Sequence, residues 1–268
     1  MSTALTSIVV PCHDNLLYTA LCLRSIALHT PQPHEVVVVD NGCTDATSEW
    51  CAAEGARVVR SPVNLGFAGG ANLGLAAAAG DVVVLLNNDA LATPGWLAGL
   101  LGALAREPGL GIAGPRSNWV SDDQIIPHVP YSEAPSPELD DFAAARAREH
   151  AGRGREATRI SGLCMTIARP VLDTIGGFDT RFEVGNMEDE DYALRARLAG
   201  FRLWVADDAY VHHFGHKTFA IVDEDYDTLL ENNAMRYAMK WGLPMGGDPR
   251  GILPDRGFDP QRDVVRLD

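Results

Sequence analysis

Short runs of apolar residues alternate with longer amphipathic stretches along the first third of the chain. The runs at 6–10, 36–39 and 82–86 are rich in valine, isoleucine and leucine, as is typical of strands buried on both faces of a parallel sheet. Between the first two runs, apolar residues recur at helical spacing until the prolines at 31 and 33. This alternation predicts an α/β fold with a mostly parallel central sheet flanked by helices.

The pattern continues to residue 115 and then weakens into polar, proline-bearing loops at 116–159, which are typical of binding loops or lids. Trp119, Asp122, Asp123 and Gln124 are either substrate contacts or part of a solvated loop, and we favour the loop. Before residue 116 the other predicted elements are a helix at 45–54 capped by Thr44 or Asp45, a strand at 56–59, a glycine-rich segment at 64–74 that precedes an alanine-rich helix, a helix with Thr93 as its N-cap and Pro94 as its first residue, and a strand at 111–115. After it they are a helix at 138–150, a strand at 160–167, a short helix from Pro170, a helix from Glu188 that Gly200 ends, and strands at 203–206 and 209–211.

Composition narrows the class of protein. The length of 268 residues suits one α/β domain, and the formal net charge of −14 argues against a nucleic-acid partner bound through its backbone. No apolar run approaches the ~20 residues that span a bilayer. We therefore expect a cytoplasmic protein without a transmembrane segment, and contact with the inner membrane face stays open. The five cysteines include no CxxC pair, which favours reduced, mostly buried thiols over a zinc site or disulfides.

Three polar residues, Asn87, Asn88 and Asp89, directly follow the apolar run at 82–86. In open α/β sheets, ligands bind just beyond the carboxyl ends of the strands, so Asp89 lies where chemistry usually occurs. Asn and Asp are also ordinary turn formers. Taken alone, the stretch is therefore equally consistent with a ligand site and with a polar turn.

The glycine-rich segment at 64–74 has two interpretations. Its glycines could let the backbone approach a phosphate, or they could allow close packing of a helix on the sheet. Their spacing fits neither the GxGxxG pattern nor a GxxxxGK[ST] phosphate loop. A Rossmann oxidoreductase and a P-loop NTPase are both disfavoured.

Four acids at 188–191 open a predicted helix, where the helix dipole favours negative charge, and Asp191 can pair with Arg195 at i,i+4. Four adjacent like charges repel one another, so a cation or a functional partner explains the whole cluster better. A carboxylate there could act as a general base. The later HHxxH sequence at 212–216 lacks the helical HExxH context of zinc enzymes and any nearby Cys ligand, and a single histidine there is more often structural.

Together, these segments resemble the family 2 inverting glycosyltransferases, including the rhamnosyltransferase-like members, which use nucleotide sugars and have the GT-A fold. The resemblance covers roughly residues 6–243. Each motif is weak, but their order and spacing are specific. The matching stretches are Ile8-Val-Val-Pro11 with Asn15, Val37-Val-Val-Asp40-Asn41-Gly42, Asn64-Leu-Gly66-Phe67 with Asn72, Leu85-Leu-Asn-Asn-Asp89, Gly176-Gly-Phe-Asp179, Glu188-Asp189-Glu-Asp191, Arg195-Ala-Arg-Leu-Ala-Gly200 and His213-Phe-Gly215.

The resemblance implies a role for each matching residue. A nucleoside-diphosphate sugar would be held by the loops after the first strands, and a divalent cation by the counterpart of the DxD motif, in which Asn87 replaces the first Asp. Carboxylate, amide and imidazole ligands favour Mn²⁺ or Mg²⁺ over Zn²⁺. The implied donor-binding residues are Pro11, Asn15, Asp40, Asn64, Gly66, Asn72 and Asn88; the metal ligands are Asp89 and His213, with His212 as the alternative; and the catalytic residues are Asp189 as general base with Glu188 beside it and Asp191 as the fallback.

The resemblance predicts metal-dependent, inverting transfer of a sugar to the hydroxyl of a glycan, lipid-linked glycan, peptide or small metabolite. A catalytically silent nucleotide-sugar-binding or scaffolding module of the same fold is the alternative. A nucleotidyltransferase would need a basic, glycine-rich loop that residues 12–15 do not provide. We expect a transferase domain at 1–243, with a nucleotide-sugar-binding half at 1–115 and an acceptor and catalytic half at 116–243. An extended tail at 244–268 would wrap the domain or join a neighbouring subunit in a homo-oligomer.

Overall fold

The computed structural model describes residues 5–106, 108–120, 122–183, 185–215, 226–245 and 248–267. Its strands form one sheet in the order β3-β2-β1-β4-β8-β6-β9-β5, with β7 paired to β9. The elements are β1 (Thr6–Cys12), α1 (Leu16–His29), β2 (His34–Asn41), α2 (Thr47–Ala53), β3 (Arg57–Ser61), α3 (Gly66–Ala77), β4 (Val82–Leu86), β5 (Ala90–Ala92), α4 (Trp96–Arg106), β6 (Leu110–Ser117), the 3-10 turn η1 (Asp122–Gln124), α5 (Pro137–Glu149), β7 (Gly154–Ala157), β8 (Cys164–Ala168), α6 (Arg169–Ile175), α7 (Glu188–Leu198), β9 (Arg202–His213) and α8 (Tyr226–Trp241).

The sheet is parallel in its first half and mixed in its second. Strands β3, β2, β1 and β4 are all parallel neighbours, as the alternation of strand and helix predicts. The predicted α/β fold with a central sheet flanked by helices is confirmed, and beyond β4 the sheet is mixed: β8 runs antiparallel to both β4 and β6, whereas β6 and β9 are parallel. This reversal places the turn before β8 next to the polar residues that follow β4, since Leu86 pairs with Cys164.

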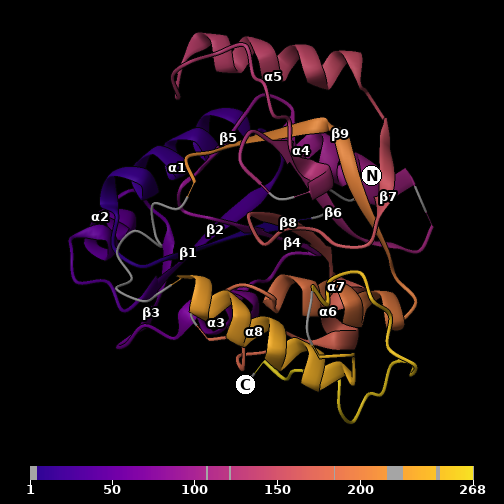
Figure 1. Cartoon of the computed structure of the whole chain (residues 1–268). Helices are drawn as coiled ribbons and strands as arrows, with labels where there is room; N and C mark the ends of the chain where they lie inside the picture. Colours follow the sequence, from indigo (N-terminus) through magenta and orange to yellow (C-terminus); the bar gives the residue numbers. More distant parts are fainter. Residues whose placement is uncertain are drawn as a thin grey trace.

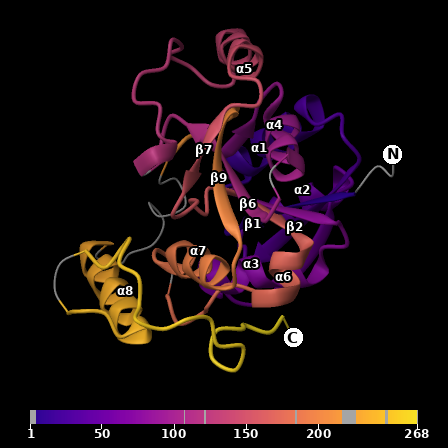
Figure 2. The same ribbon diagram turned by 90° about the vertical axis from the view of Figure 1, so that its right-hand side faces the viewer.

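Helices cover both faces of the sheet (Figures 1 and 2). Helices α1, α2, α4 and α5 lie on one face, and α3, α6, α7 and α8 lie on the other. Successive side chains of β1 point to opposite faces of the sheet. Ile8 and Val10 pack with α1 and α4 on one face, whereas Val9 packs with α3, α6 and α7 on the other. Burial of both faces is why the central strands are continuous apolar runs.

Small residues let α3 approach the sheet closely. A Cβ atom on Gly74 would lie 2.2 Å from Val9, and one on Gly70 would lie 2.9 Å from Asn41. The glycine-rich segment is mostly helix, because α3 begins at Gly66, and the expectation that the segment precedes the helix is wrong. At Gly70 and Gly74 the structure shows helix–sheet packing.

Several predicted boundaries shift. Helix α4 begins at Trp96 because Gly95 has a φ of 83°, outside the helical region, and the Thr93 hydroxyl donates to the Tyr210 carbonyl instead of capping the helix. Asp45 accepts from the Thr47 amide where α2 begins, whereas Thr44 bonds to Asp14. The strand predicted at 160–167 begins only at Cys164, the two strands predicted at 203–206 and 209–211 are the single strand β9, and β7 and α8 were not predicted.

The described part of the tail packs against its own domain. Val265 forms a bridge with Gly176, and Asp263 is buried beside Arg256. Contact of the tail with its own domain therefore occurs at Gly176, and contact with a neighbouring subunit stays a prediction. All five cysteines are free thiols, and only Cys43 is not fully buried. None of the helices in the described ranges is both long and apolar enough to cross a bilayer.

Candidate active site

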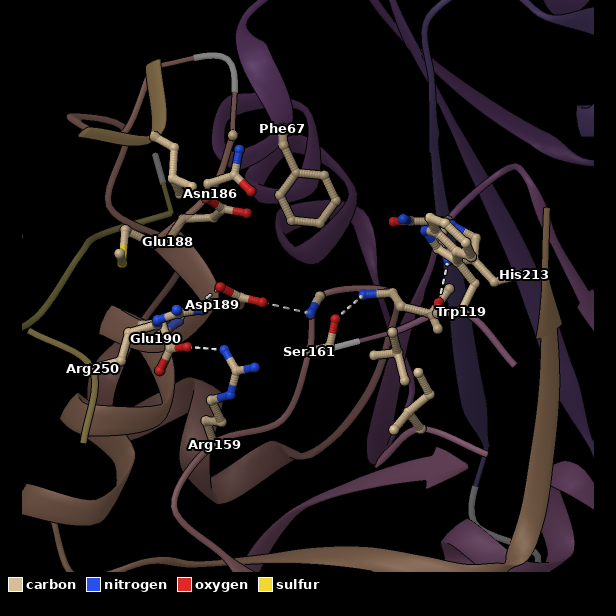
Figure 3. Close-up of a pocket in the computed structure, with 18 of the residues that line it drawn as sticks. Phe67, Trp119, Arg159, Ser161, Asn186, Glu188, Asp189, Glu190, His213 and Arg250 are labelled. Carbon is tan, nitrogen blue, oxygen red and sulfur yellow. Dashed lines mark hydrogen bonds and ion pairs between the residues drawn. The ribbon is translucent and has the colours of Figure 1, made fainter. Parts of the chain in front are cut away.

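A cavity of about 470 Å³ opens beyond the polar end of β4. Segments that are far apart in the sequence meet there, and Figure 3 shows Glu188, Asp189 and Glu190 on one side with Trp119 and His213 on the other. The lining residues are Phe67, Asn87, Asp89, Trp119, Val120, Ile125, Arg159, Ser161, Gly162, Leu163, Gly185, Asn186, Met187, Glu188, Asp189, Glu190, Leu230, His213 and Arg250.

Asp89 and His213 meet at one end of this cavity. The Asp89 Oδ1 atom lies 3.1 Å from the His213 Nε2 atom, although 124 residues separate them. The antiparallel pairing of β5 with β9 explains this meeting, because Ala90 lies opposite His213 in the register. Asp89 is only 3% exposed, so its carboxylate is shielded from bulk water.

The protein holds His213 by its main chain and by its ring. The Asn118 amide bonds to both the N–H and the carbonyl of His213, and the Trp119 carbonyl lies 2.7 Å from the ring Nδ1 atom. A carbonyl can only accept, so Nδ1 must carry a proton. Nε2 then reaches Asp89 either as the second N–H of an imidazolium or as a lone pair that a cation shares with the carboxylate.

His212, the alternative ligand, lies outside the cavity lining. Its Nδ1 atom is 2.9 Å from the Tyr131 hydroxyl, and its ring contacts Phe214 edge-on. Burial, followed by the charge of His213, lowers the pKa of His212 to about 4. Of the two histidines, His213 is therefore the one placed to bind a cation with Asp89.

Asp189 lines the opposite wall in the first turn of α7. Its Oδ2 atom accepts from the Gly162 amide at 3.0 Å, and its Oδ1 atom accepts from the Glu190 amide at 2.9 Å. These two bonds fix the carboxylate against the turn before β8. A carboxylate has about four lone-pair sites, so a proton from a ligand hydroxyl can still be accepted.

The two glutamates beside Asp189 are buried, and both have raised pKa values. Burial and the Asp189 charge raise the pKa of Glu188 well above its ordinary range. The same two causes raise the pKa of Glu190 to about 7, against the opposing effect of its ion pair with Arg159.

Asp191, the fallback base, does not line the cavity. It is fully buried and pairs with Arg195 at 2.8 Å and with Lys240, and it also accepts from the Trp241 indole N–H at 3.0 Å. These contacts anchor α7 to α8. The predicted i,i+4 pair of Asp191 and Arg195 is confirmed.

Most of the predicted donor-binding residues gather at one edge of the sheet. Pro11 and Asp40 lie near the ends of β1 and β2, Asn15 precedes α1, and Asn64 and Gly66 lie at the start of α3. None of these five is among the lining residues of the cavity. Burial acts to raise the Asp40 pKa, but hydrogen bonds from the Cys43 amide and the side chain of Ser48 bring it below its ordinary value.

Asn72 and Asn88 are used within the fold and also lie outside the cavity lining. The Asn72 amide bonds to both the N–H and the carbonyl of Phe178, at 2.7 and 2.8 Å. Asn88 is buried and donates to the Thr19 hydroxyl at 2.9 Å. Of the predicted site residues, the cavity is lined by Asp89, His213, Glu188 and Asp189. Asn72 and Asn88 are not among its lining residues.

The chain is similar to a known protein family. Residues 7–152 match the family described as Glycosyl transferase family 2. The chain belongs to glycosyl transferase family 2. An N-acetylglucosaminyl-diphospho-decaprenol L-rhamnosyltransferase of Mycobacterium tuberculosis is 28% identical to this family 2 chain, over 73% of the chain and 72% of the relative.

Two further relatives are uncharacterized. Rv1525 of Mycobacterium tuberculosis is 36% identical to the family 2 chain over 60% of the chain, and y4gI of Sinorhizobium fredii is 28% identical over 79% of it. The chain spans 59% of the length of Rv1525 and 24% of the length of y4gI.

Solved structures show the GT-A fold of nucleotide-sugar transferases. The mannosyltransferase PcManGT from Pyrobaculum calidifontis, in complex with GDP-Man and Mn²⁺, superposes with a TM-score of 0.61 at 20% identity, over 91% of this chain and 66% of that chain. Glucosyl-3-phosphoglycerate synthase from Mycobacterium tuberculosis, with Mn²⁺, UDP-glucose and phosphoglyceric acid, gives 0.57 at 19% identity, over 91% and 82%.

Sequence reasoning missed part of the site of this family 2 chain. Trp119 lines the cavity and is 53% exposed, although we favoured a solvated loop there. Gln124 is buried, and it bonds to the Ser161 amide and the Pro115 carbonyl. Arg159 and Arg250 also line the cavity, and no motif in the sequence marks either of them.

Proposed function

We propose that this family 2 chain transfers a sugar from a nucleoside-diphosphate sugar to an acceptor hydroxyl, with inversion at the anomeric carbon. The observation that carries the proposal is the placement of Asp89 with His213 and of Asp189 on facing walls of one cavity. An inverting displacement needs a leaving group stabilised on one side of the sugar and a base on the other. Asp89 and His213 are proposed to stabilise the leaving group, and Asp189 is proposed to be the base.

The donor set at the first wall suits Mn²⁺ or Mg²⁺. The Asp89 carboxylate and the His213 imidazole nitrogen converge within 3.1 Å, and Asn87 adds an amide that lines the same cavity. Oxygen and imidazole ligands without thiolate favour these ions over Zn²⁺. A divalent cation held there would supply Lewis-acid stabilisation of the leaving diphosphate.

Asp189 is the proposed general base. Backbone amides on both of its oxygens hold the carboxylate in place, so that it can take the proton of an acceptor hydroxyl. Apolar lining residues, among them Phe67, Leu163 and Leu230, reduce the access of water to the same space. Asp191 is not proposed for this role because its carboxylate is paired with two basic side chains.

The nucleoside is proposed to bind at the adjacent sheet edge, where Pro11, Asn15, Asp40, Asn64 and Gly66 gather. This edge continues into the cavity through Phe67, which follows Gly66 and lines the wall. We propose the halves 1–115 for the donor and 116–243 for the acceptor, with Asp89 on the first segment and Asp189 on the second; His213, the other proposed metal ligand, comes from the second segment. The acceptors named for relatives differ, so we propose only an acceptor that carries a free hydroxyl.

A donor screen tests the proposal directly. The purified chain would be melted with UDP-glucose, UDP-N-acetylglucosamine, GDP-mannose and a rhamnosyl nucleotide, each with Mn²⁺ or with EDTA. A donor at about 100 times its Kd should stabilise the fold by roughly 2.7 kcal/mol, or about 5–10 °C, only when the metal is present. Hydrolysis of that donor, followed by NMR, should give the inverted anomer first.

Two outcomes would contradict the proposal. Stabilisation by none of the nucleotide sugars would exclude donor binding under these conditions. Donor binding without any metal-dependent hydrolysis or transfer would instead favour the catalytically silent module of the same fold.

A further inference from the structure

Glu188 differs from the three acids that follow it in α7. Asp189 accepts from two backbone amides. Glu190 forms an ion pair with Arg159, and Asp191 is paired with basic side chains of α7 and α8. Within the described part of the chain, the Oε2 atom of Glu188 has no hydrogen-bond partner.

This unpaired oxygen lies in a buried position at the cavity wall. Glu188 is 5% exposed and lines the cavity (Figure 3). A buried polar atom without a partner costs free energy, and such atoms are rare in native structures. A ligand in the cavity would remove this cost by bonding to Oε2.

The backbone before Glu188 is also strained. Asn186 and Met187 have φ angles of 75° and 73°, in the left-handed region that side chains larger than glycine rarely adopt. Strain of this kind persists at sites where function requires a particular geometry. Here the two residues set the direction in which the first turn of α7 enters the cavity wall.

The chemistry of Glu188 matches that of a sugar hydroxyl. Burial and the adjacent Asp189 charge raise its pKa well above the ordinary range, which favours the neutral carboxylic acid. A neutral carboxyl group both donates and accepts hydrogen bonds, and so does a hydroxyl group. An anionic group such as phosphate would instead face the neighbouring Asp189 carboxylate.

We propose that Glu188 binds a hydroxyl group of the transferred sugar and so contributes to the choice of donor. The inference rests on the function proposed above. The transferred sugar has to lie between Asp89 with His213 and the base Asp189. Glu188 is buried, whereas Asp189 is half-buried, so Asp189 is the more accessible of the two to an incoming acceptor.

The test compares a nucleotide sugar with its own nucleoside diphosphate. Calorimetric titrations with Mn²⁺ would use the donor that stabilises the wild type most, for example UDP-glucose with UDP, or GDP-mannose with GDP. Glu188→Ala should raise the Kd of the nucleotide sugar about tenfold and leave that of the diphosphate unchanged. Glu188→Gln keeps a donor and an acceptor and should stay within about threefold of the wild type.

A matched control separates ligand binding from helix stability. Glu138 lies in the first turn of α5, is exposed and is not a lining residue of the cavity, so Glu138→Ala removes an acid from the first turn of another helix without a ligand contact. Both Kd values should be unchanged in this variant. If Glu188→Ala does not fold, Glu188→Met fills a similar volume without hydrogen bonding and takes its place.

Three results would overturn the inference. They are an unchanged nucleotide-sugar Kd in Glu188→Ala, an equal loss for the nucleotide sugar and the diphosphate, and a Glu188→Gln variant as weak as Glu188→Ala. A wild type that binds the diphosphate but no nucleotide sugar would contradict the proposed function itself. The two failures can therefore be distinguished.

Discussion

Asn118 holds the main chain of His213 with both ends of its side-chain amide. Its Nδ2 atom donates to the His213 carbonyl at 3.0 Å, and its Oδ1 atom accepts from the His213 N–H at 2.8 Å. The two residues lie 95 positions apart in the sequence. This clamp sets the position from which the imidazole faces Asp89.

The clamp predicts that Asn118→Ala weakens Mn²⁺ binding. Asn72 makes the same two-point contact with Phe178 away from the cavity, so Asn72→Ala is a matched control. Both variants should lose roughly 1–3 kcal/mol of stability, because each leaves backbone groups unpaired. Only Asn118→Ala should raise the Kd for Mn²⁺, measured by titration in the presence of a nucleoside diphosphate. Equal Mn²⁺ affinities in the two variants would show a purely structural role.

The adjacent histidines should behave differently. His213→Ala should abolish metal-dependent stabilisation by the nucleotide sugar, because only His213 faces Asp89. His212→Ala should lower the melting temperature through loss of its contacts with Tyr131 and Phe214, and it should keep the Mn²⁺ response. Thermal melts with Mn²⁺ and with EDTA measure both effects. The reverse result would assign the metal to His212.

Asp189→Asn should reduce kcat by about 10²–10⁴, since general-base help is typically worth that much. Asn has one acceptor oxygen in place of two, so one of the two backbone bonds is lost. The Kd for the donor should change little, because the metal that binds its diphosphate is proposed to lie at Asp89 and His213. Asp173→Asn, at an exposed position of α6, controls for the loss of one acid. Transfer or hydrolysis at a near-normal rate in a folded Asp189→Asn variant would exclude Asp189 as the base.

The buried cation Lys240 should contribute strongly to stability. It lies between Asp179 and Asp191, so Lys240→Met leaves two buried carboxylates with reduced compensation. Breaking a buried pair typically costs about 3–5 kcal/mol. Arg236→Met, on the same helix, removes a more exposed pair with Glu183 and should cost no more than about 1 kcal/mol. Urea titrations compare the two variants, and equal losses would contradict this account.

The raised pKa of Glu190 predicts a pH dependence of folding. Its pKa is about 7 in the folded protein against an ordinary value of 4.5, so between these values the folded state binds more protons than the unfolded state. The free energy of unfolding should therefore fall as the pH rises from about 4.5 to 7. In Glu190→Gln, the free energy of unfolding should fall by about 1–3 kcal/mol less over this pH range than in the wild type. Urea unfolding at several pH values measures the slopes, and parallel curves would contradict the prediction.

The local features of this protein could be predicted from its sequence. Continuous apolar runs such as 82–86 identify central strands, because residues buried on both faces leave no polar alternation. The spacing of Asp191 and Arg195 predicts their ion pair, because residues four apart lie on one helix face. Motif order also predicted the family, and through it a set of site residues of which Asp89, Asp189 and His213 line one cavity.

Only the tertiary structure decided how these residues are used. His213 faces Asp89 and His212 does not, because the register of β5 with β9 sends neighbouring side chains to opposite faces of the sheet. Asn72 belongs to a donor motif in the sequence, yet its amide is used by Phe178. Glu188 and Asp191 are both acids of one turn, but one lines the cavity and the other is paired within the core. Burial and partners arise from contacts between distant segments, and the spacing of residues along a chain does not specify them.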